Sequence, residues 1–106
     1  MKKIAIIPAF NEEKNIEKVI LSIKQWQPDF DIVVINDGSV DLTSSVARQT
    51  KQAVVIDLPA NIGIGGAVQT GFIYSRRKDY DLAVQIDGDG QHDAAEIEKL
   101  IEPILT

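Results

Sequence analysis

Hydrophobic residues along this chain fall into two alternating patterns. Four short runs are almost continuously apolar and rich in β-branched residues, as strands buried on both faces of a parallel sheet are. These runs cover residues 3–8, 31–36, 53–58 and 82–86. Between them, apolar residues recur at spacings of three and four, which is typical of one buried helix face. These segments cover residues 12–27, 41–49 and 65–78, and a fourth begins at Asp93.

Polar residues mark the expected start of the first helix. Asn11 is its predicted N-cap, with Glu12 and Glu13 in the first turn and Pro28 beyond its end. The residues expected to face the core from the first three helices are Ile16, Val19, Ile20, Ile23, Trp26, Leu42, Val46, Ala67, Val68 and Phe72.

Alternating strands and helices predict an α/β fold of three layers, αβα, with a mostly parallel sheet. Right-handed crossovers favour the strand order 3-2-1-4, which is Rossmann-like and puts the first and fourth strands side by side. In open sheets of this kind, ligands bind where the order reverses, at the carboxyl ends of the strands. Polar motifs follow three of the strands, at residues 8–12, 36–39 and 87–89. We therefore expect these motifs to line one crevice.

The acidic run at residues 87–93 carries the strongest chemical signal. It holds Asp87, Asp89, Gln91 and Asp93, so oxygen ligands stand at alternate positions after a strand. Such ligands suit a hard divalent cation such as Mg²⁺, Mn²⁺ or Ca²⁺. Asp93 is also the expected cap of the fourth helix. The single histidine, His92, suits a contact outside the metal's own ligand set.

Two other protein classes share parts of this run. An EF-hand loop would begin at Asp87, but its sixth position would be His92 instead of glycine, and a strand leads into it. A haloacid-dehalogenase-like phosphatase also has Asp-x-Asp-Gly after a strand, with the first Asp as nucleophile. That class needs a later Lys and an acidic pair, for which little chain remains.

Two further segments have more than one interpretation. The glycine-rich stretch 61–66 lacks the third glycine of a dinucleotide fingerprint, since Val68 stands there. It either offers backbone N–H groups to a phosphate or allows close packing of helix on sheet. The basic residues 76–78 either complement a helix end or contact a phosphate.

Composition narrows the class of partner. The chain has 106 residues, enough for one domain (1–106), and a formal net charge of −5. This charge argues against nucleic-acid binding, which usually needs a basic surface. An acidic protein that binds an anionic ligand needs a cation or backbone N–H groups to offset repulsion.

The absence of cysteine fits a reducing compartment, and no run is long enough to predict a membrane span or signal peptide.

Four motifs together resemble the family 2 glycosyltransferases, most closely the branch of dolichyl- and polyprenyl-phosphate mannosyl- and glucosyltransferases. They are PAFNEE at 8–13, NDGS at 36–39, NIGIGG at 61–66 and DGDGQHD at 87–93. The resemblance covers almost the whole chain. It implies a GT-A fold and transfer of a sugar, with inversion, from a nucleotide diphosphate donor such as a UDP- or GDP-sugar.

The resemblance also implies which residues hold the nucleotide. Pro8, Phe10 and Glu12 would lie against it, with Phe10 where the family often has tyrosine. Asp37 would accept a hydrogen bond from the base.

A second group of residues would hold the diphosphate. Asp87, beside Gly88, would approach the ribose or the metal, and Asp89 and Gln91 would hold Mn²⁺ or Mg²⁺. The cation would neutralise charge that grows on the leaving nucleoside diphosphate.

Members of this family normally have a second half that carries the acceptor site and the acidic general base. We therefore interpret the chain as the donor-binding portion and expect the base beyond residue 106, so that this piece alone is inactive. The resemblance implies a lipid-phosphate or glycan acceptor and a cytoplasmic location, with the full-length protein at the cytoplasmic face of a membrane. The alternative is a non-catalytic module that binds nucleotide or self-associates into a homo-oligomer.

Overall fold

The computed structural model describes residues 1–88. In chain order the elements are β1 (Lys3–Ala9), α1 (Ile16–Trp26), β2 (Phe30–Asn36), α2 (Thr43–Gln49), β3 (Val54–Asp57), α3 (Ile64–Arg77) and β4 (Leu82–Gln85). The predicted alternation of strand and helix is confirmed through β4. The expected fourth helix lies outside the described residues.

The four strands form one parallel sheet in the order β3-β2-β1-β4, as predicted. β1 is central: it pairs with β2 from Lys3↔Phe30 to Ala9↔Asn36, and with β4 from Lys3↔Leu82 to Ile6↔Gln85. The chain order reverses between β1 and β4. Their carboxyl ends therefore meet at the edge where such sheets form ligand crevices.

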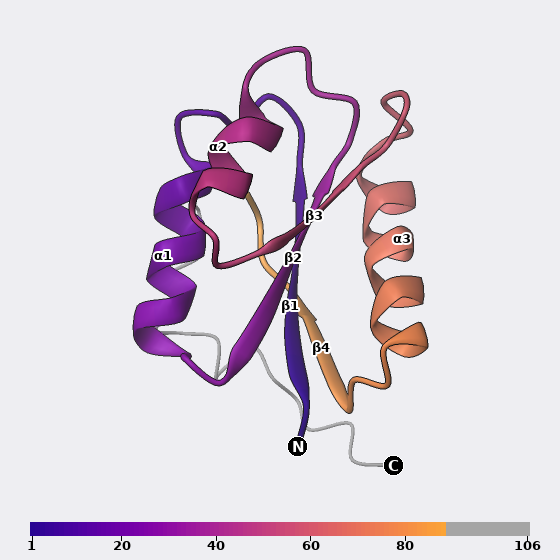
Figure 1. Cartoon of the computed structure of the whole chain (residues 1–106). Coiled ribbons are helices and arrows are strands. Elements are labelled where there is room, and N and C mark those ends of the chain that lie inside the picture. The colour runs from indigo at the N-terminus through magenta and orange to yellow at the C-terminus, as the bar shows by residue number, and fades with distance from the viewer. Residues whose placement is uncertain (89–106) are drawn as a thin grey trace.

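Helices cover both faces of the sheet, which gives the predicted three layers (Figure 1). α1 and α2 lie on one face, over a cluster that includes Ile7, Ile20 and Val34. α3 lies on the other face, over a cluster that includes Ile6 and Val33. Both faces of β1 and β2 are thus buried, which explains their nearly continuous apolar sequences.

The start of α1 differs from the prediction. Asn11 is not its N-cap, and Glu12 and Glu13 are not in its first turn, because the helix begins at Ile16 after Asn15. Asn11 instead adopts a left-handed conformation, with φ of 54°. The carbonyl oxygen of Glu12 accepts hydrogen bonds from the N–H groups of Asn15 and Ile16, which makes residues 12–15 a turn before the helix.

Some residues expected in the core are exposed. Trp26, Leu42 and Phe72 have relative exposures of 54%, 62% and 41%. The buried residues of α2 are Thr43 and Ala47, and those of α3 are Ala67, Gly71 and Ser75. The buried face of α1 is otherwise as predicted, and Trp26 is its last residue. In α2 and α3 small or polar residues face the sheet, and an apolar pattern does not identify such a face.

Candidate functional site

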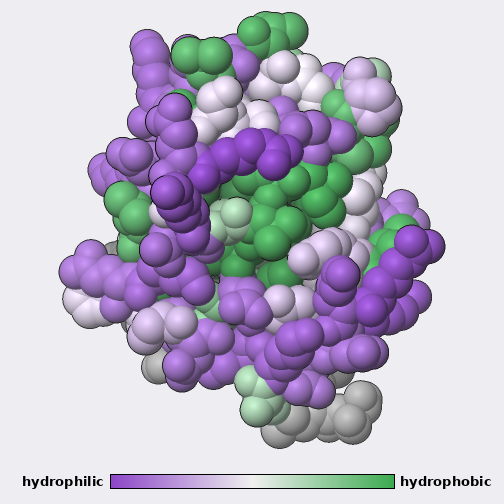
Figure 2. Space-filling model, in the orientation of Figure 1, coloured by the Kyte–Doolittle hydropathy of each residue, from purple (hydrophilic) through white to green (hydrophobic). Residues whose placement is uncertain are grey.

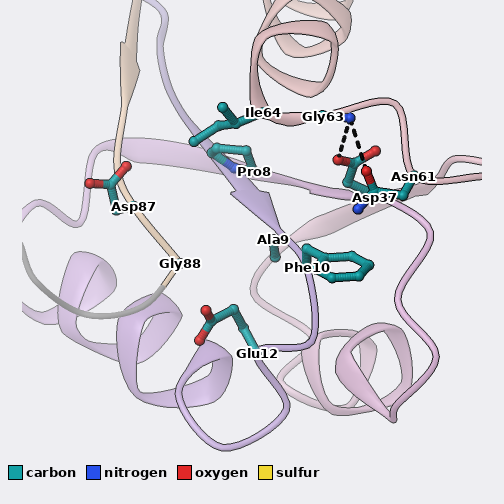
Figure 3. Close-up of a pocket in the computed structure, with 10 residues that line it drawn as sticks. All are labelled: Pro8, Ala9, Phe10, Glu12, Asp37, Asn61, Gly63, Ile64, Asp87 and Gly88. Carbon is teal, nitrogen blue, oxygen red and sulfur yellow. Dashed lines mark hydrogen bonds between the residues drawn. The ribbon is translucent and has the colours of Figure 1, made fainter.

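A pocket of about 350 Å³ opens at the carboxyl ends of the strands. Its lining comes from the end of β1 and the segment after it, from the segments after β2 and β4, and from the segment that leads into α3. The lining residues are Pro8, Ala9, Phe10, Glu12, Asp37, Asn61, Gly63, Ile64, Asp87 and Gly88. In Figure 3, Asp87 and Asp37 lie on opposite sides of the view, with Pro8 to Phe10 between them. This arrangement follows the sheet order, since β1 lies between β4 and β2.

Every predicted binding residue within the described part of the chain contributes to this lining. These residues are Pro8, Phe10, Glu12, Asp37, Asp87 and Gly88. The strand order therefore brings the three polar motifs together, as expected. Asp89 and Gln91, the expected metal ligands, lie outside the described residues.

Gly88 allows β4 to end close to β1. A Cβ atom at this position would lie 3.1 Å from the carbonyl oxygen of Pro8 and 3.4 Å from the Cβ of Ala9. A side chain at position 88 would crowd the pocket residues at the end of β1. Because glycine has no side chain, Asp87 can lie next to the end of β1.

The carboxylate of Asp37 is buried and shapes the pocket wall. Its Oδ1 accepts a hydrogen bond from the N–H of Ile62 at 2.8 Å, and its Oδ2 accepts one from the N–H of Gly63 at 3.0 Å. Figure 3 shows the contact with Gly63. Asp37 thus fastens the segment between β3 and α3 to the end of β2, a function that the sequence did not reveal.

Gly38 completes this junction. Its φ is +70°, and a Cβ atom there would lie 2.4 Å from the nitrogen of Asn61 and 2.6 Å from the carbonyl carbon of Ala60. Only glycine fits both the backbone conformation and the space. The turn at 36–39 is therefore a tight turn, and it also builds the pocket.

The glycine-rich stretch does not serve helix–sheet packing. A Cβ atom at Gly65 would touch nothing within 4 Å, and one at Gly66 would meet the side chain of Ile62. The interpretation based on close packing is wrong for these two glycines. The stretch instead leads into α3 at Ile64, beside the pocket, where the first N–H groups of a helix lack intrahelical acceptors.

The charged residues near the predicted motifs differ in whether they lie at the pocket. Residues 76–78 are exposed at the carboxyl end of α3, whereas the amino end of that helix borders the pocket, so these residues do not line it. Within residues 1–88, no group of three or more Asp, Glu or His side chains could hold a metal. Glu12 and Asp87 do bring carboxylate oxygens to the pocket, a donor chemistry that fits Mn²⁺ or Mg²⁺.

The sequence missed four lining residues: Ala9, Asn61, Gly63 and Ile64. The stretch 61–66 had a phosphate contact as one of its two interpretations, but no single residue in it was predicted to line the crevice. The buried Asp37 explains the omission, because its contacts draw Asn61 to Ile64 into the pocket across about 25 residues of sequence. No local pattern reports such a contact.

Comparison with known proteins gives matches over nearly the whole chain. Residues 4–106 match the family model described as glycosyl transferase family 2. A UDP-N-acetylglucosamine–dolichyl-phosphate N-acetylglucosaminyltransferase of Methanococcus voltae is 33% identical over 94% of this chain and 46% of its own length. An undecaprenyl-phosphate mannosyltransferase of Micrococcus luteus is 28% identical over 100% of this chain and 45% of its own length.

A solved structure shows the same fold. Glucosyl-3-phosphoglycerate synthase from Mycobacterium tuberculosis, in complex with Mn²⁺, UDP and glucosyl-3-phosphoglycerate, superposes with a TM-score of 0.79 at 29% identity. The match covers 99% of this chain and 40% of that structure. The chain therefore spans less than half the length of the proteins that it resembles.

Proposed function

This chain belongs to glycosyl transferase family 2, and we propose that it is the donor-binding portion of an enzyme that transfers a sugar from a UDP- or GDP-sugar with inversion. The observation that carries the proposal is that one pocket gathers the three polar motifs at the carboxyl ends of β1, β2 and β4. Neither a phosphatase nor a calcium-loop interpretation is favoured. A strand, β4, leads into the acidic run, whereas an EF-hand loop follows a helix.

The lining suggests how the nucleoside would be held. Phe10 is 45% exposed at the pocket and offers a ring face to the nucleotide, with Pro8 beside it. Asp37 uses its carboxylate for Ile62 and Gly63 but has lone pairs left. A base with a ring N–H, such as uracil or guanine, could donate to them. This chemistry agrees with a UDP- or GDP-sugar as donor.

The diphosphate needs positive charge, because the chain carries a net charge of −5. We assign Asp89 and Gln91 to Mn²⁺ or Mg²⁺, with Asp87 on the metal or the ribose. The Mycobacterium tuberculosis synthase, which was crystallised with Mn²⁺ and UDP, supports a divalent cation. When bound, the cation would neutralise charge on the departing nucleoside diphosphate.

The names of two relatives support a proposal for the acceptor. They are named for dolichyl or undecaprenyl phosphate, so we propose a polyprenyl phosphate as acceptor, with a glycan as the alternative. Such an acceptor lies in a membrane, and we propose that the full-length protein works at the cytoplasmic face. No helix within residues 1–88 has the length and apolar composition needed to cross a bilayer.

Calorimetric titration with UDP and with GDP, in the presence of Mn²⁺ or of EDTA, tests this proposal. We expect binding of one nucleotide with Mn²⁺ and weakening of at least about tenfold (~1.4 kcal/mol) with EDTA or in Asp89→Ala. Asp29→Ala, at an exposed carboxylate outside the pocket, is the matched control and should bind as the wild type does. Absence of binding by either nucleotide with Mn²⁺ would refute the donor-site assignment.

A further inference from the structure

Two loops at the pocket are joined by hydrogen bonds between side chains and backbone. One loop follows β1 (residues 10–15) and the other links β2 to α2 (residues 37–42). Three consecutive backbone N–H groups of the first loop are bound by side chains of residues 39–43. The pairs are Asn11 N to Ser39 Oγ (2.9 Å), Glu12 N to Thr43 Oγ1 (2.8 Å) and Glu13 N to Asp41 Oδ2 (3.2 Å).

Side chains of the first loop also accept hydrogen bonds from backbone N–H groups of the second loop. The N–H of Val40 donates to Asn11 Oδ1 at 3.0 Å, and the N–H of Leu42 donates to Glu13 Oε2 at 3.3 Å. Each loop therefore satisfies backbone groups of the other. Such groups would otherwise have no sheet or helix partner.

Asp41 and Thr43 form the centre of this arrangement. The carboxylate of Asp41 accepts hydrogen bonds from the N–H and the hydroxyl of Thr43, and from the N–H of Glu13. A hydroxyl has one hydrogen, and Thr43 donates it to Asp41. Its oxygen is thereby oriented to accept the N–H of Glu12.

These two residues act at a distance from the pocket. Thr43 is fully buried, and neither Thr43 nor Asp41 contributes to the pocket lining. Phe10 and Glu12 do contribute, and between them Asn11 holds a left-handed backbone conformation that most residues avoid. A loop of this shape needs external contacts to persist.

We infer that Asp41 and Thr43 are positioning residues, which hold Phe10 and Glu12 in the wall of the nucleotide pocket without touching the nucleotide. The inference rests on the proposed function for the identity of the ligand. The Glu12 side chain is fixed on its other side by Asn15, whose Nδ2 donates to Oε2 at 2.9 Å.

The charge of Asp41 agrees with this role. Burial raises the pKa of Asp41, but hydrogen bonds from the side chain and backbone of Thr43 and from the backbone of Glu13 outweigh it, so the net pKa is lowered. Asp41 is thus an anionic acceptor at neutral pH.

The test compares Thr43→Val with Thr43→Ser. Valine matches the shape of threonine but cannot accept from Glu12, whereas serine keeps the hydroxyl. We expect Thr43→Val to bind UDP or GDP, with Mn²⁺ present, about tenfold more weakly, and Thr43→Ser to stay within about twofold. Asp41→Asn should resemble Thr43→Val. Thr70→Val is the control, because Thr70 donates to Gly66 O in α3, outside these loops.

Amide hydrogen exchange of Glu12 and Glu13 provides a second measurement, taken where thermal unfolding shows each variant to be folded. We expect faster exchange in Thr43→Val and Asp41→Asn but not in Thr70→Val. Wild-type nucleotide affinity in a folded Thr43→Val would overturn the inference. If the wild type binds neither nucleotide, the proposed function fails by itself, and unchanged exchange would overturn the positioning role independently.

Discussion

The Asp37 carboxylate lies in the pocket wall and also anchors the segment that precedes α3. Replacement by alanine would remove the proposed contact with the base and release Ile62 and Gly63 at the same time. A loss of binding in that variant would therefore not identify a base contact. Binding must be compared with the exchange of the two amides to separate the two effects.

Asp57 occupies a comparable position at the end of β3. Its Oδ1 accepts from the Nδ2 of Asn36 at 3.0 Å, and its Oδ2 accepts from Arg48 at 2.6 Å. The hydrogen bond from Asn36 is the main reason why the pKa of Asp57 is lowered; burial opposes it, and Ser44 and Arg48 add to the lowering. Asn36 in turn accepts the N–H of Ser39, so this contact supports the turn at the pocket.

The lowered pKa of Asp57 makes a prediction about pH. The ionised carboxylate is favoured in the folded state, so its contribution to stability is full above the unfolded value of about 3.8 and is lost as the pH falls through the lower folded value. In urea titrations from pH 7 to pH 2.5, Asp57→Asn should be less stable than the wild type above pH 5, and the difference should narrow below pH 4.

Asp29→Asn controls for the loss of one negative charge at an exposed site. It should show a smaller change in unfolding free energy across the same range. A constant difference between wild type and Asp57→Asn down to pH 2.5 would contradict the assigned ionisation.

At the scale of elements, the apolar pattern predicted all four strands, and right-handed crossovers predicted their order. β1 and β2 are buried on both faces as expected, whereas β3 and β4 are only partly buried. The starts of the helices were predicted less well. Asn11 and the two glutamates that follow it have the composition of a helix start. Their partners, however, are Ser39 and Asp41 on the loop before α2 and Thr43 at the first position of α2. Long-range partners of this kind override local capping preferences.

The part of the pocket that depends on strand order was predictable from the sequence, and the part that depends on long-range side-chain contacts was not. Residues directly after β1, β2 and β4 follow from the strand order alone. Asn61 and Ile64 do not, because β3 is an outer strand and its following segment reaches the pocket only through Asp37. The sequence indicates where β3 ends, but not that the Asp37 side chain binds the following segment at the pocket.

The contact of α3 with β1 depends on a glycine. A Cβ atom at Gly71 would lie 2.3 Å from Cγ2 of Ile6, and 3.2 Å and 3.3 Å from Cγ1 and Cβ of the same side chain. Ile6 is fully buried in the central strand and has a stiff, β-branched side chain. The helix therefore rests directly on the sheet at this point.

Gly71→Ala should lower the free energy of unfolding by about 1–3 kcal/mol, because overpacking would push α3 away from β1. Urea denaturation measures the change. Gly65→Ala in the same helix is the matched control, since its Cβ would touch nothing within 4 Å; it should be neutral or up to about 1 kcal/mol more stable. Equal effects of the two substitutions would show that the close contact with Ile6 is unimportant.

At the scale of the whole molecule, the outer edge of β3 is an unpaired strand edge within the described sheet. Val54 is 49% exposed there, and Figure 2 shows a hydrophobic area bordered by hydrophilic side chains in the region where Figure 1 places β3. Arg48 lies along this edge: its Nη2 donates to Asp57 and, at 3.4 Å, to the carbonyl oxygen of Val55. A charged side chain on an edge opposes pairing with another sheet.

Arg48→Ala should therefore self-associate more strongly than the wild type, by roughly tenfold in the association constant. Sedimentation velocity over a series of concentrations measures this. Arg77→Ala removes the same charge at the end of α3 and serves as the control. Identical sedimentation of wild type and Arg48→Ala at every concentration would argue against the edge-blocking role and against β3 as a site of homo-oligomer formation.

The pairing of β4 with β1 has a consequence for the order of folding. Asp87 and Gly88 reach the pocket through the last described strand, which pairs with the first. Contacts between segments so distant in the chain form late, because a long loop must close first. During synthesis the first three strands are made before β4. If the chain binds the proposed nucleotide, that ligand would stabilise the completed sheet by mass action but would not guide the earlier steps of its assembly.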